Sequence, residues 1–207
     1  MAFNKHKNPK LVYGVGINDA SYVVARRENG KQVMCPVYCM WKSMLHRCYG
    51  AKTLDYNKAY IGCSVDPEWI RFSGFEKWLL QQPDNWRTED YELDKDLLVE
   101  GNRVYGPNTC LLVPKVVNNF FHQKFTEDIG VRYFPNRKKP WRAACGSGKR
   151  NDKWIAYFAT KEEARDAYLK EKIRRGNSIA ETLQDPTLKN AFIARLRLFE
   201  SRMTSLV

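Results

Sequence analysis

Hydrophobic positions recur at strand spacing in some parts of the chain and at helical spacing in others, which predicts a mixed architecture. Near the N-terminus, strands are expected at residues 11–17, at residues 21–27 and from residue 31, with a turn at residues 28–30. A helix is then expected from Pro36, because proline is favoured at the first helical position, to Gly50. Its apolar stripe comprises Val37, Met40, Trp41, Met44, Leu45 and Cys48.

The middle of the chain predicts a second helix and then a group of short elements. The helix begins after Asp66, an N-cap residue that is followed by proline. Its apolar positions are Trp69, Phe72, Phe75 and Leu79. Residues 92–121 predict a strand, a long loop, a second strand and a helix that follows Pro114. Asn102 and Asn108 are candidates to brace that loop.

The last third of the chain predicts a small sheet followed by two helices. Short segments with strand character lie at residues 130–134, 140–146 and 153–158. The next helix has Thr160 as its N-cap and Glu163 three positions later, which is a capping box. A final amphipathic helix is expected at about residues 185–203. The whole chain is therefore assigned to the α+β class.

The composition is that of a folded protein without a membrane anchor. Hydrophobic residues make up 43% of the 207 residues and aromatic residues 13%, enough to bury a core. No stretch approaches the roughly 18 apolar residues of a membrane span. The N-terminus is basic and lacks the apolar segment of a secretory signal. These features predict a soluble intracellular protein.

The six cysteines allow two interpretations besides packing: disulfides, which the missing export signal disfavours, and a zinc site. The chain contains no paired C-x-x-C motif, and several cysteines fall on apolar faces. Reduced structural cysteine is therefore the prediction for all of them. The six are Cys35, Cys39, Cys48, Cys63, Cys110 and Cys145.

The positive charge is concentrated in one region. The chain carries a formal net charge of +12, and residues 131–176 hold 14 basic and 5 acidic side chains, a net charge of +9. Basic side chains on one face of a sheet would form a cationic plate that fits the roughly 12 Å major groove of DNA. The alternative is an incidental basic surface. Membrane binding is disfavoured, because the basic residues follow strand spacing and not one face of an amphipathic helix.

The same region carries a family resemblance. Residues 130–172 contain a G-V-R strand, a W-x-A strand, an aromatic strand before T-x-E-E-A, and an Ala-Tyr pair on the helix. This combination resembles the sheet-plus-helix DNA-binding domain of plant ethylene-response transcription factors, which also occurs at the C-terminus of phage homing endonucleases. The resemblance implies DNA contacts by Arg132, Arg137, Trp141, Arg142, Arg150 and Trp154. The neighbouring lysines are also predicted to bind DNA: Lys138, Lys139, Lys149 and Lys153.

The upstream part resembles the same phage proteins. The stretches at residues 40–50, 60–79 and 93–121 look like HNH-type phage endonucleases, so that the likeness covers roughly residues 10–180. It implies an HNH-like ββα-metal module at residues 1–127, with an N-terminal elaboration. A small three-stranded antiparallel sheet packed on a helix, with a C-terminal helix, is expected at residues 128–207. The implied location is the cytoplasm of the infected bacterial host cell.

The resemblance also names a candidate catalytic site. In HNH enzymes an acid and a histidine on the first strand, with a His or Asn on the helix, hold one divalent metal and activate water. Asp94, Lys95 and Asp96 stand at the strand position, and Asn118 stands on the expected helix. His122 follows Asn118 by four positions, so both would share a face and hold a metal together with Asp94. If the site is active, the implied cofactor is Mg²⁺ or another divalent metal; if it is inactive, no cofactor is implied.

Lys95 occupies the position expected for the general-base histidine. A lysine is a poor base while charged, and flanking aspartates favour the charged ammonium. Three routes stay open: Asp96 acts as the base with Asp94 and Asn118 as ligands, His122 is recruited, or the site is inactive and Lys95 forms a structural ion pair with the aspartates. Whether the chain is an enzyme is therefore left open.

Three functions follow. The first is a double-stranded DNA-binding protein of the phage HNH homing-endonuclease type that hydrolyses phosphodiester bonds. The second is a catalytically inactive DNA-binding protein on the same scaffold, which acts as a repressor or interferes with a host or competing genetic element. The third is an inhibitor that applies its basic face to an acidic protein. The sequence does not determine the oligomeric state.

Overall fold

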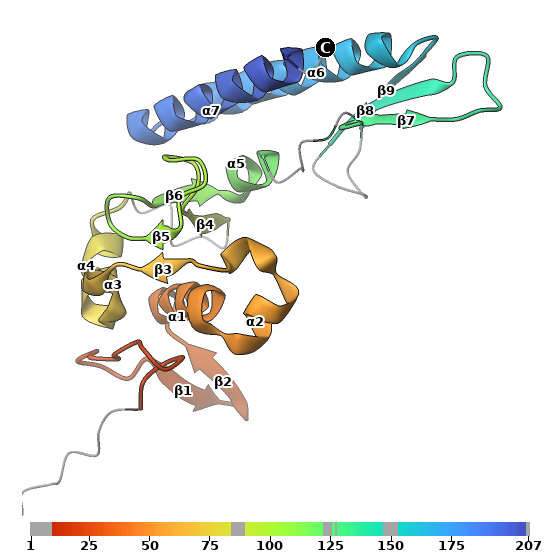
Figure 1. Ribbon diagram of the computed structural model, residues 1–207. Coiled ribbons are helices and arrows are strands. Elements are labelled where there is room, and N and C mark those ends of the chain that lie inside the picture. The colour runs from red at the N-terminus through yellow and green to blue at the C-terminus, as the bar shows by residue number, and fades with distance from the viewer. Residues whose placement is uncertain (1–9, 84–89, 122–125, 127, 147–152, 206–207) are drawn as a thin grey trace, which may run out of the picture. The chain divides into compact units, whose positions relative to one another are not determined.

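The computed structural model describes all residues except 1–9, 84–89, 122–125, 127, 147–152 and 206–207. It mixes helices with small sheets, which confirms the α+β class (Figure 1). The chain forms two compact units, Met1–Leu112 and Val113–Val207. The division precedes the boundary predicted after residue 127, because Phe120 packs against Phe192 within the second unit, with ring centroids 5.4 Å apart.

The first unit is built on the predicted helix α1 (Pro36–Tyr49), which Gly50 ends as the C-cap. The short helices α2 (Ala51–Tyr56) and η1 (Lys58–Tyr60) follow it. Trp41 of α1 is fully buried, and its indole Nε1 donates a hydrogen bond of 2.7 Å to the Trp69 carbonyl. Tyr38 and Phe72 contact its ring, with centroids 5.5 and 5.6 Å away, and such aromatic side chains bury large apolar areas.

The single helix predicted after Asp66 is wrong: the segment forms two helices, α3 (Pro67–Ile70) and α4 (Phe72–Leu80). Asp66 is the N-cap, as predicted. The break lies at Arg71, whose backbone is extended because Ile17 pairs with it. The Ile17 amide donates to the Ile70 carbonyl at 2.9 Å, and the Phe72 amide donates to the Ile17 carbonyl at 3.0 Å. Backbone bonds from Ile17, which is distant in the sequence, therefore separate the two helices.

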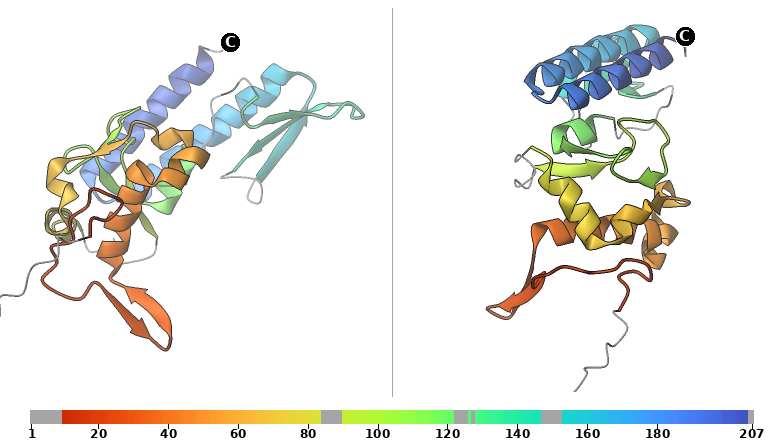
Figure 2. Two further views of the ribbon diagram at one scale, coloured as in Figure 1. Left: turned by 60° about the horizontal axis from the view of Figure 1, so that its bottom comes forward. Right: turned by 90° about the vertical axis from the view of Figure 1, so that its left-hand side faces the viewer.

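The strand predicted at residues 11–17 is also wrong. Residues 12–16 form a tight turn in which Tyr13 has φ 51° and Gly14 has φ 80°, conformations that interrupt a strand. The next two predicted strands form an antiparallel hairpin of β1 (Ala25–Glu28) and β2 (Lys31–Met34). Figure 2 shows this hairpin extending away from the helices of its unit.

The remaining strands of this part of the chain are short. β3 (Ser64–Val65) pairs in parallel with β5 (Val104–Tyr105), which lies inside the segment predicted to be a loop. β4 (Tyr91–Asp94) pairs with β6 (Leu111–Pro114). Helix α5 (Lys115–Phe120) follows directly, so that strand, loop, strand and helix occur in the predicted order.

The second unit contains an antiparallel sheet in the order β7 (Val131–Tyr133), β8 (Trp141–Cys145) and β9 (Lys153–Phe158). One face packs on α6 (Lys161–Thr182), which begins with the predicted capping box of Thr160 and Glu163. Helix α7 (Pro186–Thr204) lies alongside α6 (Figure 1). Gly130, with φ 72°, precedes β7 and lies so close to the buried Tyr168 ring that a Cβ there would be 2.0 Å from it.

No helix in the described part of the chain is long and apolar enough to cross a membrane.

Candidate functional site

Asp94 closes strand β4 and forms a turn with the two residues after Lys95. Its Oδ1 accepts hydrogen bonds from the backbone amides of Asp96, at 2.9 Å, and Leu97, at 2.7 Å. This is an Asx-type turn, in which the carboxylate replaces a backbone acceptor. Burial raises the pKa of Asp94 above its usual value, and the nearby Asp96 charge acts in the same direction.

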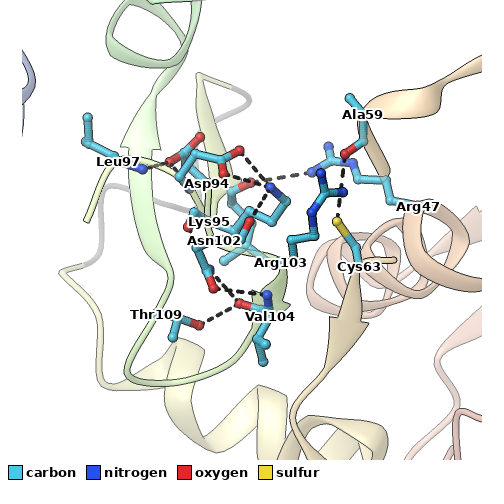
Figure 3. Close-up of polar contacts among 12 residues, drawn as sticks. Arg47, Ala59, Cys63, Asp94, Lys95, Leu97, Asn102, Arg103, Val104 and Thr109 are labelled. Carbon is cyan, nitrogen blue, oxygen red and sulfur yellow. Dashed lines mark hydrogen bonds and ion pairs between the residues drawn. The ribbon is translucent and has the colours of Figure 1, made fainter. Parts of the chain in front are cut away.

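Lys95 is buried at the centre of this turn, with 6% of its surface exposed (Figure 3). Its ammonium Nζ donates to both carboxylate oxygens of Asp96, at 2.8 and 2.7 Å, and to the carbonyl of Asn102 at 2.8 Å. An ammonium has three N–H donors, and these three bonds use all of them. In this arrangement Lys95 is a charged structural group and has no lone pair to act as a base.

Asn102 braces the loop, as predicted. Its amide Nδ2 donates to the carbonyls of Lys95 and Val104, both at 2.8 Å, and its Oδ1 accepts from the Val104 amide at 3.0 Å. Thr109 also donates to the Val104 carbonyl, at 2.7 Å. The bonds connect the turn after β4 with β5, so the Asp94–Asp96 segment is held as one hydrogen-bonded structure.

The carboxylate oxygens of this turn are not arranged to bind a divalent metal. Both Asp96 oxygens bond the Lys95 ammonium, and Asp94 Oδ1 bonds two amides. Asn118 lies on α5 in the second unit, and His122 lies outside the described residues. Within the described ranges, no group of three or more His, Cys, Asp or Glu side chains is placed to hold a metal ion. None of the six cysteines, all of which lie in the described ranges, forms a disulfide bond.

The second candidate site is the sheet face that points away from α6. Arg132 of β7 pairs with Arg142 of β8, and Arg142 pairs with Tyr157 of β9, so these three side chains share one face. Alternate positions, Val131 and Ala143, are buried against α6, which identifies the arginine face as the outer one. We call the side chains of Arg132, Arg137, Arg142, Trp154 and Tyr157 the outer sheet face.

Aromatic rings and cations are interleaved on the outer sheet face. The Arg137 guanidinium lies over the Tyr157 ring, 4.1 Å from its centroid, which is a cation–π contact. Trp154 is 62% exposed, and its ring lies 6.3 Å from that of Tyr157. The stacking of Arg137 on an aromatic ring restricts its side chain, while Trp154 presents a large apolar surface to solvent.

Sequence analysis did not predict Tyr157 as a member of the outer sheet face. Strict alternation along β9 would group Tyr157 with Lys153, on the α6 side. The register shifts by one residue between Ala143 and Ala144 of β8, and this irregularity places Tyr157 and Trp154 on the same side. A bulge leaves no clear mark in the sequence, so only the pairing register identifies this residue.

Other predicted DNA-binding residues lie elsewhere. Trp141 shares the face of the buried Ala143 and packs against the α6 core. Lys153 pairs with the buried Cys145, which puts it on the α6 side as well. Lys138 and Lys139 are exposed in the turn between β7 and β8. Lys149 and Arg150, the last two predicted DNA-binding residues, lie outside the described residues.

Comparison of the chain with protein-family models, with curated proteins and with solved structures found no match.

Proposed function

We propose that this protein binds double-stranded DNA with the outer sheet face, and that the Asp94–Asp96 turn is a structural element and not a nuclease centre. The observation that carries the first part is the cross-strand row of Arg132, Arg142 and Tyr157 on a face that α6 leaves open. Arginine binds phosphates and the guanine edge in a bidentate manner, and a small sheet fits the major groove. The local net charge of +9 supplies long-range attraction to DNA.

The bonding of Lys95 supports the second part. The sequence leaves three alternatives open for this site. The inactive site, with Lys95 in a structural ion pair, agrees best with an ammonium that bonds both Asp96 oxygens and the Asn102 carbonyl. Metal-dependent hydrolysis stays a prediction from the family resemblance, and it requires this turn to rearrange. The order of β4, β6 and α5 supports an HNH-like module that is retained as a scaffold.

A DNA-binding protein without cleavage activity acts by occupying its site. The biological role that follows is repression, or interference with a host or competing genetic element, in the cytoplasm of an infected bacterium. The third function, inhibition of an acidic protein, uses the same cationic face but does not require the strand spacing to match a DNA groove.

The test of DNA binding is a gel shift on duplex DNA from about 50 to 200 mM salt. Arg132→Gln and Arg142→Gln are each expected to weaken binding at least fivefold and to reduce the slope of log affinity against log salt by about 0.9. Arg197→Gln, an equal charge change at an exposed position of α7, is the matched control. Equal losses in all three variants, or no loss in the sheet variants, would contradict the assignment of the face.

The nuclease question is tested on the same DNA. Supercoiled plasmid is incubated with the full chain and Mg²⁺ or Mn²⁺, beside Asp94→Ala and Asp96→Ala. We expect salt-sensitive binding and no nicking. Metal-dependent nicking that either substitution abolishes would overturn the structural interpretation of the turn and restore the endonuclease function.

A further inference from the structure

A pocket in the second unit lies apart from the outer sheet face. It has a volume of about 520 Å³, which is within the usual range of roughly 300–1,000 Å³ for small-ligand sites. Helix α5, strand β9 and helix α6 all contribute to its lining. The residues that matter here are Val116, Phe120, Lys153, Lys172, Arg174 and Arg175.

Lys172 is a buried cation in the wall of this pocket, with 4% of its surface exposed. Its Nζ donates to the Phe120 carbonyl at 2.6 Å and lies 3.9 Å from the centroid of the Phe120 ring. In the described part of the chain, no carboxylate pairs with this ammonium. A buried charge without a counter-ion is costly, so an anion that enters the pocket gains unusually strong attraction.

The carboxylate of the pocket, Glu171, is already paired with two arginines. Glu171 accepts hydrogen bonds of 2.7 and 2.8 Å from Arg174 and one of 2.7 Å from Arg175. These bonds hold the pKa of Glu171 down at about 2, so it stays ionised at neutral pH. With Lys153 and Lys172 the lining carries four cations and one anion, an excess of three positive charges. The same bonds fix the positions of the two guanidinium groups at the pocket.

Val116, Phe120 and Ile179 form an apolar part of the pocket wall. Val116 is 56% exposed, and the Phe120 ring is packed under Lys172. We propose that this pocket binds a phosphate ester, with the phosphate between Lys153, Arg174 and Arg175 and the organic group against Val116. Two sources share this chemistry, a free phosphate monoester and a phosphate diester of bound DNA. The binding of a free ester does not depend on the proposed DNA-binding function.

The pH dependence follows from the groups around Lys172. Burial lowers the pKa of Lys172 to about 8, and the Arg175 charge acts in the same direction. The other groups around it are Cys145 of β8, Glu171 of the same helix, and the rings of Phe120 and Phe199. Because deprotonation removes one of the cations, binding of a phosphate ester is expected to weaken between pH 7 and pH 9.

The test is calorimetric titration of the full chain, at constant ionic strength, with inorganic phosphate and with phenyl phosphate. Phenyl phosphate is expected to bind at least fivefold more tightly than inorganic phosphate. Lys153→Gln and Arg174→Gln are each expected to weaken it fivefold or more, and Arg197→Gln to change it less than twofold. Val116→Ser, at an exposed position, should reduce the preference for phenyl phosphate at least twofold.

A duplex DNA arm with the same variants distinguishes the two sources. Loss of phenyl phosphate binding in Lys153→Gln assigns the pocket to a free ester, and loss of duplex affinity alone assigns it to the DNA backbone. No effect on either ligand, or an equal effect of Arg197→Gln, overturns the proposal. Because Arg142→Gln reports on the outer sheet face separately, failure of the pocket and failure of the DNA-binding function are distinguishable.

Discussion

The ion pair of Lys95 and Asp96 makes a quantitative prediction for Asp96→Asn. The Lys95 side chain is 8% exposed and the Asp96 side chain 46%, so the pair is intermediate between a buried and a surface ion pair. Breaking a buried pair costs about 3–5 kcal/mol, whereas a surface pair contributes about 0–1 kcal/mol. Asparagine keeps one acceptor oxygen but removes the charge, and we expect a loss of about 2 kcal/mol of unfolding free energy.

Asp94→Asn is the matched control. Its Oδ1 can still accept the amides of Asp96 and Leu97, and the substitution removes a carboxylate whose pKa burial already raises. We therefore expect a change within about 0.5 kcal/mol.

The assay is urea denaturation followed by far-UV circular dichroism. Hydrogen exchange of peptides from residues 91–105 assigns the transition to the first unit. With a slope of about 2 kcal/mol per molar urea, Asp96→Asn should lower the midpoint by about 1 M. A neutral Asp96→Asn, or a larger loss in Asp94→Asn, would refute the view that the Lys95 pair holds this turn.

Two further predictions concern the fold. Gly130→Ala should lower the unfolding free energy by about 2–4 kcal/mol, because it adds a Cβ at φ 72° that meets the Tyr168 ring. Gly101→Ala, at φ 73° with no neighbour within 4 Å, is the control and should lower it by about 1 kcal/mol. Equal losses of the two variants in urea denaturation would contradict the ring contact. Lys172→Met tests linkage: the folded pKa of about 8 lies below the usual 10.5, so the unfolded chain binds the proton more tightly and wild-type stability should rise by up to about 3 kcal/mol from pH 8 to pH 10.5. The Lys172→Met variant should lose that rise, and an unchanged pH profile would show that Lys172 is not buried as a cation.

Elements that depend on local signals were predictable from the sequence. The ends of α1 follow from Pro36 and Gly50, and the start of α6 follows from Thr160 and Glu163. Each of these residues acts on backbone groups within one helical turn, so neighbours in the sequence contain the information. The break at Arg71 depends on Ile17, which lies more than fifty residues away, and no local pattern could predict it.

The candidate site was predictable in part. The sequence indicated Lys95 as the unusual residue and left three routes open, but its bond to the Asn102 carbonyl depends on how the loop closes. The basic residues of the sheet were evident from charge, whereas the face of each one depends on register. Trp141 and Tyr157 show this, because pairing and a bulge place them opposite to what residue type and alternation indicate.

The hairpin of β1 and β2 has a consequence for how the protein is handled in solution. In the described ranges it has no third strand, so both of its long edges are open to pairing with another copy. Arg26, Arg27 and Lys31 give it a positive excess over Glu28, and copies therefore repel each other at low salt. The screening length falls from about 10 Å at 0.1 M salt to about 3 Å at 1 M. Concentrated salt, the usual means of stripping nucleic acid from a basic protein, therefore also removes the repulsion that opposes edge-to-edge association, and purification should return to moderate salt once the nucleic acid has been removed.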